Sequence, residues 1–483
     1  MYIGLDIGTS SVKAILLSAD QQLVAQATAE LTVERPHSSW SEQDPRSWWD
    51  GCLKTMDEIA AQVPQAMAEV QGIGLSGHMH GATLIDANDK PLRPCILWND
   101  GRSASQCVDL EAREPKFLSL GGNRVMPGFT APKLQWVREN EPEIFAKVAK
   151  VLLPKDYVRL CLIGDYVGEM SDCAGTLWLD VAKRDWSDEL LAATGLTREH
   201  MPRLVEGSEV SGSLLPELCQ RWGMKSAPVI AGGGGDNAAS ACGVGAVEPG
   251  SGFVSLGTSG VVFVTNDKFS PNVESAVHAF CHAVPDTWHQ MGVILSATDS
   301  LNWLAKTLDA SPAELTAELG SVSGPSEVLF MPYLGGERTP HNDVGIRAGF
   351  YGISHGTDRK AMTHAVMDGV AFALMDCMEA LKAGGSSAAR LTAVGGGSRS
   401  NAWLEIIASL LDVTIDVPAD GDFGASLGAA RLGQAAAMGT TEGIFTPPPI
   451  KVSVAPREEL KKKYADAYAR WKNLYPALKQ AGF

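Results

Sequence analysis

Two short apolar runs near the start of the chain are separated by a glycine turn. Residues 1–9, MYIGLDIGT, form the first run, which only Asp6 interrupts, and residues 10–17, SSVKAILL, form the second. Apolar runs of this length on either side of a Gly-containing turn predict two strands joined as a hairpin. The turn itself lies between Gly8 and Ser11.

A similar unit occurs near the middle of the chain. Residues 250–265, GSGFVSLGTSGVVFVT, again place Gly-Thr-Ser between two apolar runs, so the tripeptide at 8–10 recurs at 257–259. Recurrence in the same strand, turn, strand context predicts two similar halves. We place their boundary near GVGAVEPG, so that residues 1–244 form a first domain and residues 245–483 a second.

Elsewhere, strand patterns alternate with helical patterns. Residues 71–76 and 83–86 are predicted strands on either side of the loop GHMHGA, and SNAWLEIIASLLD at 400–412 places its apolar residues on one helical face. A charged amphipathic helix is predicted at about 457–478. This alternation is typical of an α/β protein.

Size and composition narrow the class of protein. At 483 residues the chain exceeds what one hydrophobic core usually supports, which favours two domains. The net charge of −16 argues against a nucleic acid partner, because such partners are bound through clustered basic residues. Apolar runs are too short to cross a membrane. The nine cysteines are scattered without a CxxC pair, and the first apolar run lacks a basic leader, so we expect a cytoplasmic protein.

Three glycine-rich loops predict a nucleotide site. Each could be a plain turn, but two Gly-Thr-Ser turns at equivalent places and a third turn, AVGGGSRSNAW at 393–403, together favour backbone N–H groups that face phosphates and a surface for a purine. Lys13 could reach phosphate or solvent. The predicted nucleotide-binding residues are Gly8, Thr9, Ser10, Ser11, Lys13, Gly257, Thr258, Ser259, Gly260, Gly396, Gly397 and Asn401.

Two aspartates are candidates for the chemistry. Asp6 lies inside an apolar strand, where an unpaired carboxylate is costly, so it either bonds to turn amides or holds Mg²⁺ beside the phosphates. Asp236 follows four glycines in AGGGGDNAAS, residues 231–240. It could be an ordinary helix N-cap, worth about 1 kcal/mol. A cap does not need four glycines, so Asp236 is also a candidate general base for a substrate hydroxyl.

Two further loops predict a small polar ligand. His78, Met79 and His80 in SGHMHG lack a third ligand for a metal, and Met79 with a neutral His80 suits packing and hydrogen bonding to such a ligand. LWNDGR at 97–102 carries Trp98, Asp100 and Arg102. It is either a surface loop with an ion pair or a sugar site, in which an aromatic face covers C–H groups and charged side chains bind hydroxyls.

The chain resembles the FGGY family of carbohydrate kinases over essentially its whole length. The residues that carry the resemblance are YIGLDIGTSSVK, LWNDGR, GFTAPKLQWVREN, GGGGDNAA, LGTSG, GFYGISHGTDRKAMTHAVMDGVAF and GGGSRSNAW. Two positions depart from the family pattern: Ala361 replaces a polar or acidic residue, and His78 replaces the Gln of SGQMHG.

The resemblance implies a two-domain, actin-like ATPase fold of the ribonuclease H-like α/β class, with a cleft between the domains. It implies that Asp236 is the catalytic base, that Asp6 and Asp236 lie at Mg²⁺, and that Met79 and His80 belong to the substrate loop. We expect Trp98, Asp100, Arg102 and Asp236 to bind the sugar as well.

The implied activity is ATP-dependent phosphorylation of a sugar at its terminal hydroxyl. Asp236 would accept the proton of that hydroxyl as its oxygen attacks the γ-phosphorus of ATP. D-xylulose is the expected substrate and D-xylulose 5-phosphate the product. Ribulose, gluconate and glycerol stay open as substrates, as does an actin-like ATPase switch without a sugar. No membrane or nucleic acid partner is expected, and a homodimer is one of the oligomeric states left open.

Overall fold

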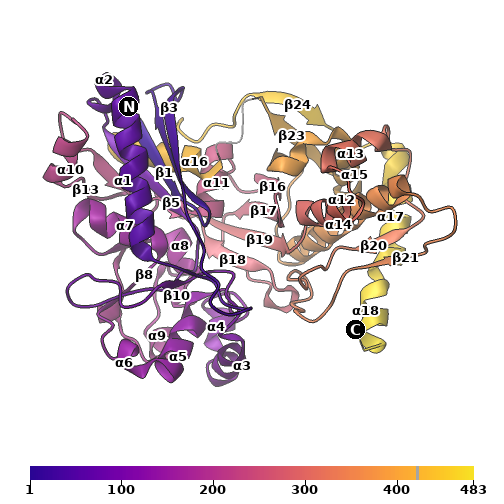
Figure 1. Cartoon of the computed structure of the whole chain (residues 1–483), viewed down its shortest axis with the longest axis horizontal. Coiled ribbons are helices and arrows are strands. Elements are labelled where there is room, and N and C mark those ends of the chain that lie inside the picture. Colours follow the sequence, from indigo (N-terminus) through magenta and orange to yellow (C-terminus); the bar gives the residue numbers. More distant parts are fainter. Residues whose placement is uncertain (420–423, 483) are drawn as a thin grey trace.

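The computed structural model of the chain describes residues 1–419 and 424–482. Figure 1 shows two lobes side by side, each built around a mixed β-sheet with helices on its faces. Most of the first lobe comes from the first half of the chain, and most of the second lobe comes from the second half (Figure 1).

The first sheet has the strand order β13-β14-β5-β1-β2-β3, with β15 also paired to β5. Its strands are β1 (Tyr2–Ile7), β2 (Ser11–Leu17), β3 (Leu23–Glu30), β5 (Gly72–Gly77), β13 (Val210–Ser213), β14 (Val229–Ala231) and β15 (Gly234–Gly235). The helices of this half are α1 (Pro45–Gln62), α2 (Pro64–Met67), α3 (Ala104–Arg113), α4 (Lys116–Ser119), α5 (Thr130–Asn140), α6 (Pro142–Phe145), α7 (Pro154–Ile163), α8 (Met170–Ala174), α9 (Asp188–Ala193), α10 (Pro216–Arg221) and α11 (Asp236–Val244).

The second sheet has the order β18-β19-β17-β16-β22-β23-β24. Its strands are β16 (Gly252–Leu256), β17 (Gly260–Asn266), β18 (His278–Cys281), β19 (Trp288–Ile294), β22 (Arg390–Val394), β23 (Thr414–Pro418) and β24 (Ile450–Val454). The helices that follow β19 are α12 (Thr298–Thr307), α13 (Pro312–Leu319), α14 (Arg359–Ala383), α15 (Asn401–Leu411), α16 (Gly424–Met438), α17 (Glu458–Lys472) and α18 (Leu474–Gln480).

Short strand pairs outside the two sheets brace the loops. They are β4 (Glu42–Gln43) with β7 (Cys95–Ile96), β6 (Thr83–Ile85) with β8 (Lys150–Leu152), β9 (Val167–Glu169) with β12 (Arg203–Val205), β10 (Leu179–Asp180) with β11 (Asp185–Trp186), and β20 (Leu329–Met331) with β21 (Gly349–Tyr351). Within the described residues, no helix is long and apolar enough to cross a lipid bilayer.

The two sheets share one arrangement at their centres. Strand β1 pairs antiparallel with β2 and parallel with β5, and β16 pairs in the same way with β17 and β22. Each Gly-Thr-Ser turn joins the antiparallel pair of its own sheet. The predicted hairpins and the predicted similarity of the two halves are therefore confirmed.

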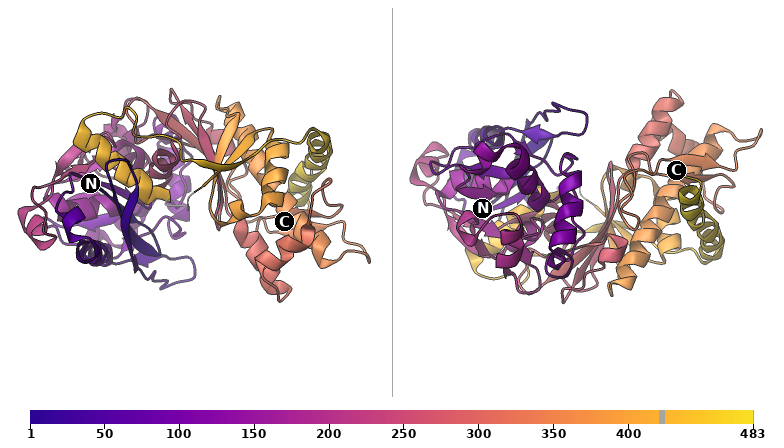
Figure 2. Two further views of the ribbon diagram at one scale, coloured as in Figure 1. Left: turned by 90° about the horizontal axis from the view of Figure 1, so that it is seen from above. Right: turned by 90° about the horizontal axis from the view of Figure 1, so that it is seen from below.

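Helix α16 departs from this division of the chain. It comes from the second half, yet it packs on α11, β5 and β1 of the first lobe (Figures 1 and 2). The predicted domain boundary at 244/245 falls between α11 and β16 and stays a prediction.

Glycines allow α16 to approach so closely. A Cβ on Gly428 of α16 would lie 1.6 Å from the carbonyl oxygen of Ala239 in α11, and one on Gly74 of β5 would lie 1.8 Å from that of Ala429. Neither site has room for a side chain. The small residues of α11 thus face the backbone of another helix.

The charged C-terminal helix is interrupted. The sequence pattern predicts one helix at about 457–478, whereas α17 ends at Lys472 and α18 begins at Leu474. Pro476 explains the break, because its ring would clash with the carbonyl group four residues earlier in a continuous helix. The apolar face of α17 is buried through Leu460, Tyr464 and Trp471.

We predict that Gly428→Ala will lower the free energy of unfolding by at least about 2 kcal/mol, because the new methyl group must push α16 away from α11. Urea denaturation followed by circular dichroism measures this. The control is Gly335→Ala, since a Cβ on exposed Gly335 meets no atom within 4 Å. Equal stability of the two variants would show that the helices can separate freely.

Candidate active site

Asp6 and Asp236 lie at the carboxyl ends of two strands, β1 and β15, that flank the same parallel strand β5. Strand β5 pairs in parallel with β1 on one side and with β15 on the other. Asp6 of β1 is level with Ser76, while Gly235 of β15 is level with Gly77 and directly precedes Asp236. The sheet therefore brings together two carboxylates that are 230 positions apart in the chain.

The surroundings disfavour the charged form of both carboxylates. Burial, followed by the negative charge of Asp6, raises the pKa of Asp236 to about 7, although hydrogen bonds from Asn237 oppose this shift. Burial also raises the pKa of Asp6, although the nearby Ser76 hydroxyl and the charge of Lys13 oppose this shift. A carboxylate with a raised pKa suits proton transfer near neutral pH, and two facing carboxylates suit a cation.

Asp236 does not cap its helix. Helix α11 begins at Asp236 with Gly235 as its N-cap, and no side chain accepts a capping hydrogen bond. The Asp236 Oδ1 atom accepts hydrogen bonds from its neighbour Asn237, from the backbone N at 2.8 Å and from Nδ2 at 3.0 Å. Of the two interpretations that the sequence allowed, the capping one is wrong.

The glycine turn before Asp236 is held by hydrogen bonds to Arg159 and Ser171. Arg159 donates from its Nη atoms to the carbonyl oxygens of Ala231 at 2.6 Å and Gly232 at 2.5 Å. The backbone N of Gly235 donates to Oγ of Ser171 at 3.0 Å. Gly233 has a φ of 77°, and a Cβ there would lie 2.1 Å from the carbonyl oxygen of Leu75. The turn therefore requires glycine and has fixed partners at both ends.

Arg159 belongs to a buried ionic cluster, and Ser171 donates a hydrogen bond to Glu169 of the same cluster. Lys155 Nζ lies 2.8 Å from Asp156, 3.2 Å from Glu169 and 3.0 Å from Asp172, and Arg159 lies 3.2 Å from Asp156. All five side chains are buried. Burial raises the pKa of Asp172 well above its usual range; the charge of Lys155 opposes this shift, and the charges of Asp156 and Glu169 add to it. Sequence reasoning did not single out this cluster.

The predicted substrate loop lies against the same turn. A Cβ on Gly235 would be 2.9 Å from Cγ of Met79, so Met79 packs beside Asp236. His80 donates from Nδ1 to the carbonyl oxygen of Gly175 at 2.7 Å, which leaves Nε2 as an acceptor. Burial, followed by the charge of Lys133, lowers the pKa of His80 to about 3, so its ring is neutral at pH 7.

His78 lies beneath this loop. Its side chain is buried, its ring meets Trp48 edge-on at 5.3 Å between centroids, and burial lowers its pKa to about 3. Lys133 holds the loop in place by donating to the carbonyl oxygens of His80 at 2.9 Å and Gly128 at 2.6 Å.

The LWNDGR residues divide into two groups. Trp98 is 36% exposed, and its Nε1 donates to Oγ1 of Thr9 at 3.1 Å, which connects this loop to the first Gly-Thr-Ser turn. Asp100 and Arg102 are buried and pair with each other at 2.7 Å, and Arg102 also pairs with Glu42 and lies 3.7 Å above the ring of Trp40. This geometry does not support the direct sugar contact predicted for Asp100 and Arg102, which stays a prediction.

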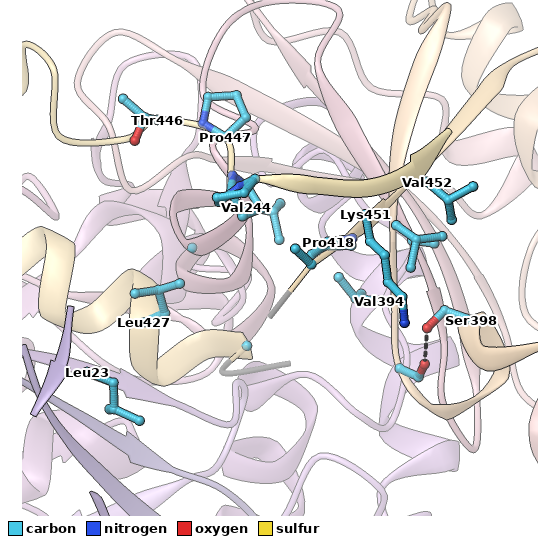
Figure 3. Close-up of a pocket in the computed structure, with 18 of the residues that line it drawn as sticks. Leu23, Val244, Val394, Ser398, Pro418, Leu427, Thr446, Pro447, Lys451 and Val452 are labelled. Carbon is cyan, nitrogen blue, oxygen red and sulfur yellow. Dashed lines mark hydrogen bonds between the residues drawn. The ribbon is translucent and has the colours of Figure 1, made fainter. Parts of the chain in front are cut away.

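A cavity of about 990 Å³ lies between the two halves (Figure 3). Its wall includes Leu23, Val244 and Leu427 on one side and Val394, Ser398 and Val452 on the other, with Ser398 bonded to the carbonyl oxygen of Gly395 at 2.6 Å (Figure 3).

The three glycine-rich loops differ in their relation to this cavity. Gly396 and Asn401 line it, whereas Gly397 packs behind the wall against Leu256. Among the described residues, the Gly-Thr-Ser turns and Lys13 do not line it. The second turn is braced by α12, because Thr298 donates to the carbonyl oxygen of Gly257 from its backbone N at 2.9 Å and from Oγ1 at 2.7 Å.

No group of three or more His, Cys, Asp or Glu side chains that could hold a metal ion occurs in the described part of the chain. Asp6 and Asp236 alone would provide two carboxylates. Such a site fits Mg²⁺, which keeps several waters and takes its remaining ligands from phosphate oxygens.

Comparison with known proteins identifies the family. Residues 1–243 match the N-terminal domain of the FGGY family of carbohydrate kinases, and residues 252–437 match its C-terminal domain. The chain is 50% identical to the xylulose kinase of Escherichia coli (strain K12) over 439 residues, 90% of each chain. It is 45% identical to that of Klebsiella pneumoniae over 483 residues, 99% of each.

A solved structure of a xyloylose kinase from Brucella ovis superposes with a TM-score of 0.97, at 54% identity and 99% coverage of both chains. These matches confirm the predicted two-domain, actin-like ATPase fold and the prediction of an enzyme. The chain belongs to the FGGY family of carbohydrate kinases.

Proposed function

We propose that the protein transfers the γ-phosphate of ATP to the terminal hydroxyl of D-xylulose and forms D-xylulose 5-phosphate. The observation that carries this proposal is Asp236, a non-capping carboxylate that a rigid glycine turn holds beside Asp6. It occurs in a carbohydrate kinase that is 50% identical to a xylulose kinase over 90% of both chains.

Asp236 is the general base of this proposal. Its carboxylate accepts the proton of the sugar hydroxyl while that oxygen attacks the γ-phosphorus, and the bond from phosphorus to the β-phosphate oxygen breaks. The raised pKa helps, because a base of pKa near 7 is largely unprotonated above that pH yet keeps a high proton affinity.

Asp6 and Asp236 would hold Mg²⁺, which when bound neutralises charge on the transferring phosphate. The cross-strand pairing of Asp6 with Lys13 keeps a cation beside Asp6 in the absence of metal. The backbone N–H groups of the two Gly-Thr-Ser turns would bind the phosphates of ATP.

The 990 Å³ cavity is the proposed site for the adenosine of ATP. Its volume is at the upper end of the usual range for small-molecule sites, and its largely apolar wall suits a purine. Gly396 opens the wall, since a Cβ there would meet no atom within 4 Å. Asn401 adds a polar group at the same edge.

The sugar would lie against Met79, His80 and Trp98. Met79 offers an apolar contact beside Asp236, His80 offers Nε2 as an acceptor, and the half-exposed ring of Trp98 can cover sugar C–H groups. The replacement of Gln by His78 does not argue against D-xylulose, because His78 is buried against Trp48 beneath the loop.

We predict that Asp236→Asn will lower kcat with D-xylulose by about two to four orders of magnitude, because the amide cannot accept the proton. Asn keeps the volume and the acceptor oxygen that Asn237 uses, so the melting temperature should stay within a few degrees of the wild type. A coupled assay for ADP at saturating MgATP measures kcat. Asp267→Asn, at an exposed aspartate, is the control. Near-normal turnover of Asp236→Asn would rule out the proposed base.

We predict that Gly257→Val will raise the KM for ATP at least tenfold, because its side chain enters the space that the phosphates need. The fold should tolerate it, since the nearest atom to a Cβ at Gly257, the Ser259 carbonyl oxygen, is 3.6 Å away and φ is not positive. Steady-state kinetics with varied MgATP, together with a melting curve, test this. An unchanged KM in a folded variant would place the phosphates elsewhere.

A further inference from the structure

Residues Glu337 and Thr339 anchor a loop of the second half, between β20 and β21, to the edge of β19. Glu337 Oε1 accepts hydrogen bonds from the backbone N of Leu295 at 3.0 Å and of Arg338 at 2.7 Å. Thr339 exchanges two hydrogen bonds with the backbone of Val293, at 3.0 and 3.1 Å. Both side chains are almost fully buried, 2% and 1% exposed, so the backbone around Arg338 is fixed.

The Arg338 side chain reaches the opposite half of the molecule. Its Nη2 atom lies 4.0 Å from where a Cβ on Gly128 would be, and that same position is 2.9 Å from the carbonyl oxygen of Trp98. Burial, then the charges of Lys133 and Arg338, lower the pKa of His80, which is consistent with a guanidinium close to the substrate loop. Arg338, a residue of the second half, thus lies near Trp98 and His80, which the proposed function places against the sugar.

The guanidinium of Arg338 has no partner within the part of the chain that the structure describes. No ion pair or hydrogen bond from its side chain occurs among residues 1–419 and 424–482. The neighbouring Glu337 carboxylate is turned toward backbone N–H groups, and burial raises its pKa to about 8. Arginine stays charged in proteins, so a partly buried guanidinium without a partner is costly.

Three arginines with more deeply buried side chains each pair with a carboxylate. Arg102 pairs with Asp100, Arg159 with Asp156, and Arg184 with Glu206. The chain carries 56 acidic residues against 40 basic ones, so carboxylates are not scarce. A fixed, unpaired guanidinium at the junction of the two halves is therefore best explained by a ligand.

The order of groups along the pocket indicates which part of the ligand Arg338 meets. Met79 packs on Gly235 beside Asp236, His80 follows Met79 in the chain, and Arg338 lies close enough to His80 for its charge to lower the pKa of that ring. In the proposed function, the terminal hydroxyl of a ketose lies at Asp236. The other end of the sugar, with its carbonyl group and first hydroxyl, then extends along the loop toward Arg338.

We infer that Arg338 is a specificity-determining residue that donates hydrogen bonds to the carbonyl end of the ketose and so links the sugar to both halves of the protein. This inference rests on the proposed function. The planar guanidinium can donate two parallel N–H bonds, which matches two adjacent sugar oxygens better than one isolated hydroxyl.

The test compares Arg338→Met with the wild type in steady-state kinetics. Met keeps much of the length but removes every donor, so the KM for D-xylulose should rise about 10- to 100-fold, the range for a lost hydrogen bond to a charged group. The KM for ATP and kcat should change less than about threefold. Arg347→Met, at an exposed arginine of the same loop, is the matched control and should leave all three values unaltered.

A second substrate separates recognition from general damage. If Arg338 binds the first hydroxyl, the wild type should favour D-xylulose over 1-deoxy-D-xylulose, and Arg338→Met should lose most of that preference. Arg338→Lys, which keeps a charged donor, should retain part of it and serves as the test variant if Arg338→Met does not fold.

Three results would overturn the inference: an unchanged KM for D-xylulose in a folded Arg338→Met, an unchanged preference between the two sugars, or a fall in kcat alone, which would place the guanidinium on the phosphates. A wild type that does not phosphorylate D-xylulose would instead refute the proposed function, so the two failures are distinguishable.

Discussion

The buried ionic cluster of Lys155, Arg159, Asp156, Glu169 and Asp172 is the constraint on which the position of Asp236 depends. It joins α7 to α8 and holds the glycine turn through Arg159 and Ser171. Loss of one partner would leave a buried charge unpaired, which typically costs about 3–5 kcal/mol. The turn is therefore anchored to buried side chains, which suits a base that must meet a hydroxyl at hydrogen-bond distance.

The site is assembled by elements from both halves of the chain. Helix α16 from the second half packs on the first sheet, and the cavity walls include Val244 from one half and Val394 from the other. Asp6 and Asp236 come from the first half, whereas Arg338 approaches from the second. A ligand that spans these groups would favour one relative placement of the halves, because it contacts both.

The sequence predicted the parts of this arrangement that follow from local pattern. Apolar runs and glycines were enough to predict the hairpins around both Gly-Thr-Ser turns, the helix at 401–411 and Asp236 as a candidate base. They were not enough to predict which distant residues pair with each other. The polar residues of LWNDGR do not indicate that Asp100 accepts a hydrogen bond from the backbone of Ser41 or that Arg102 forms an ion pair with Glu42. Charged residues within the apolar segment VLLPKDYVRLCLI indicate buried ion pairs. They do not indicate that Arg159 holds the glycine turn before Asp236, which is more than 70 residues away in the chain.

The central claim is that the fold places the Asp236 carboxyl beside that of Asp6 in a desolvated site, and a direct titration tests it. Metal-free protein with ¹³C-labelled aspartate carboxyl groups is followed by NMR against pH, and the Asp236 signal is assigned by its loss in Asp236→Asn. The account predicts a pKa of about 7 for Asp236 in the wild type and a lower value in Asp6→Asn, because removal of the neighbouring negative charge favours ionisation. A pKa of about 4 in both proteins would contradict it.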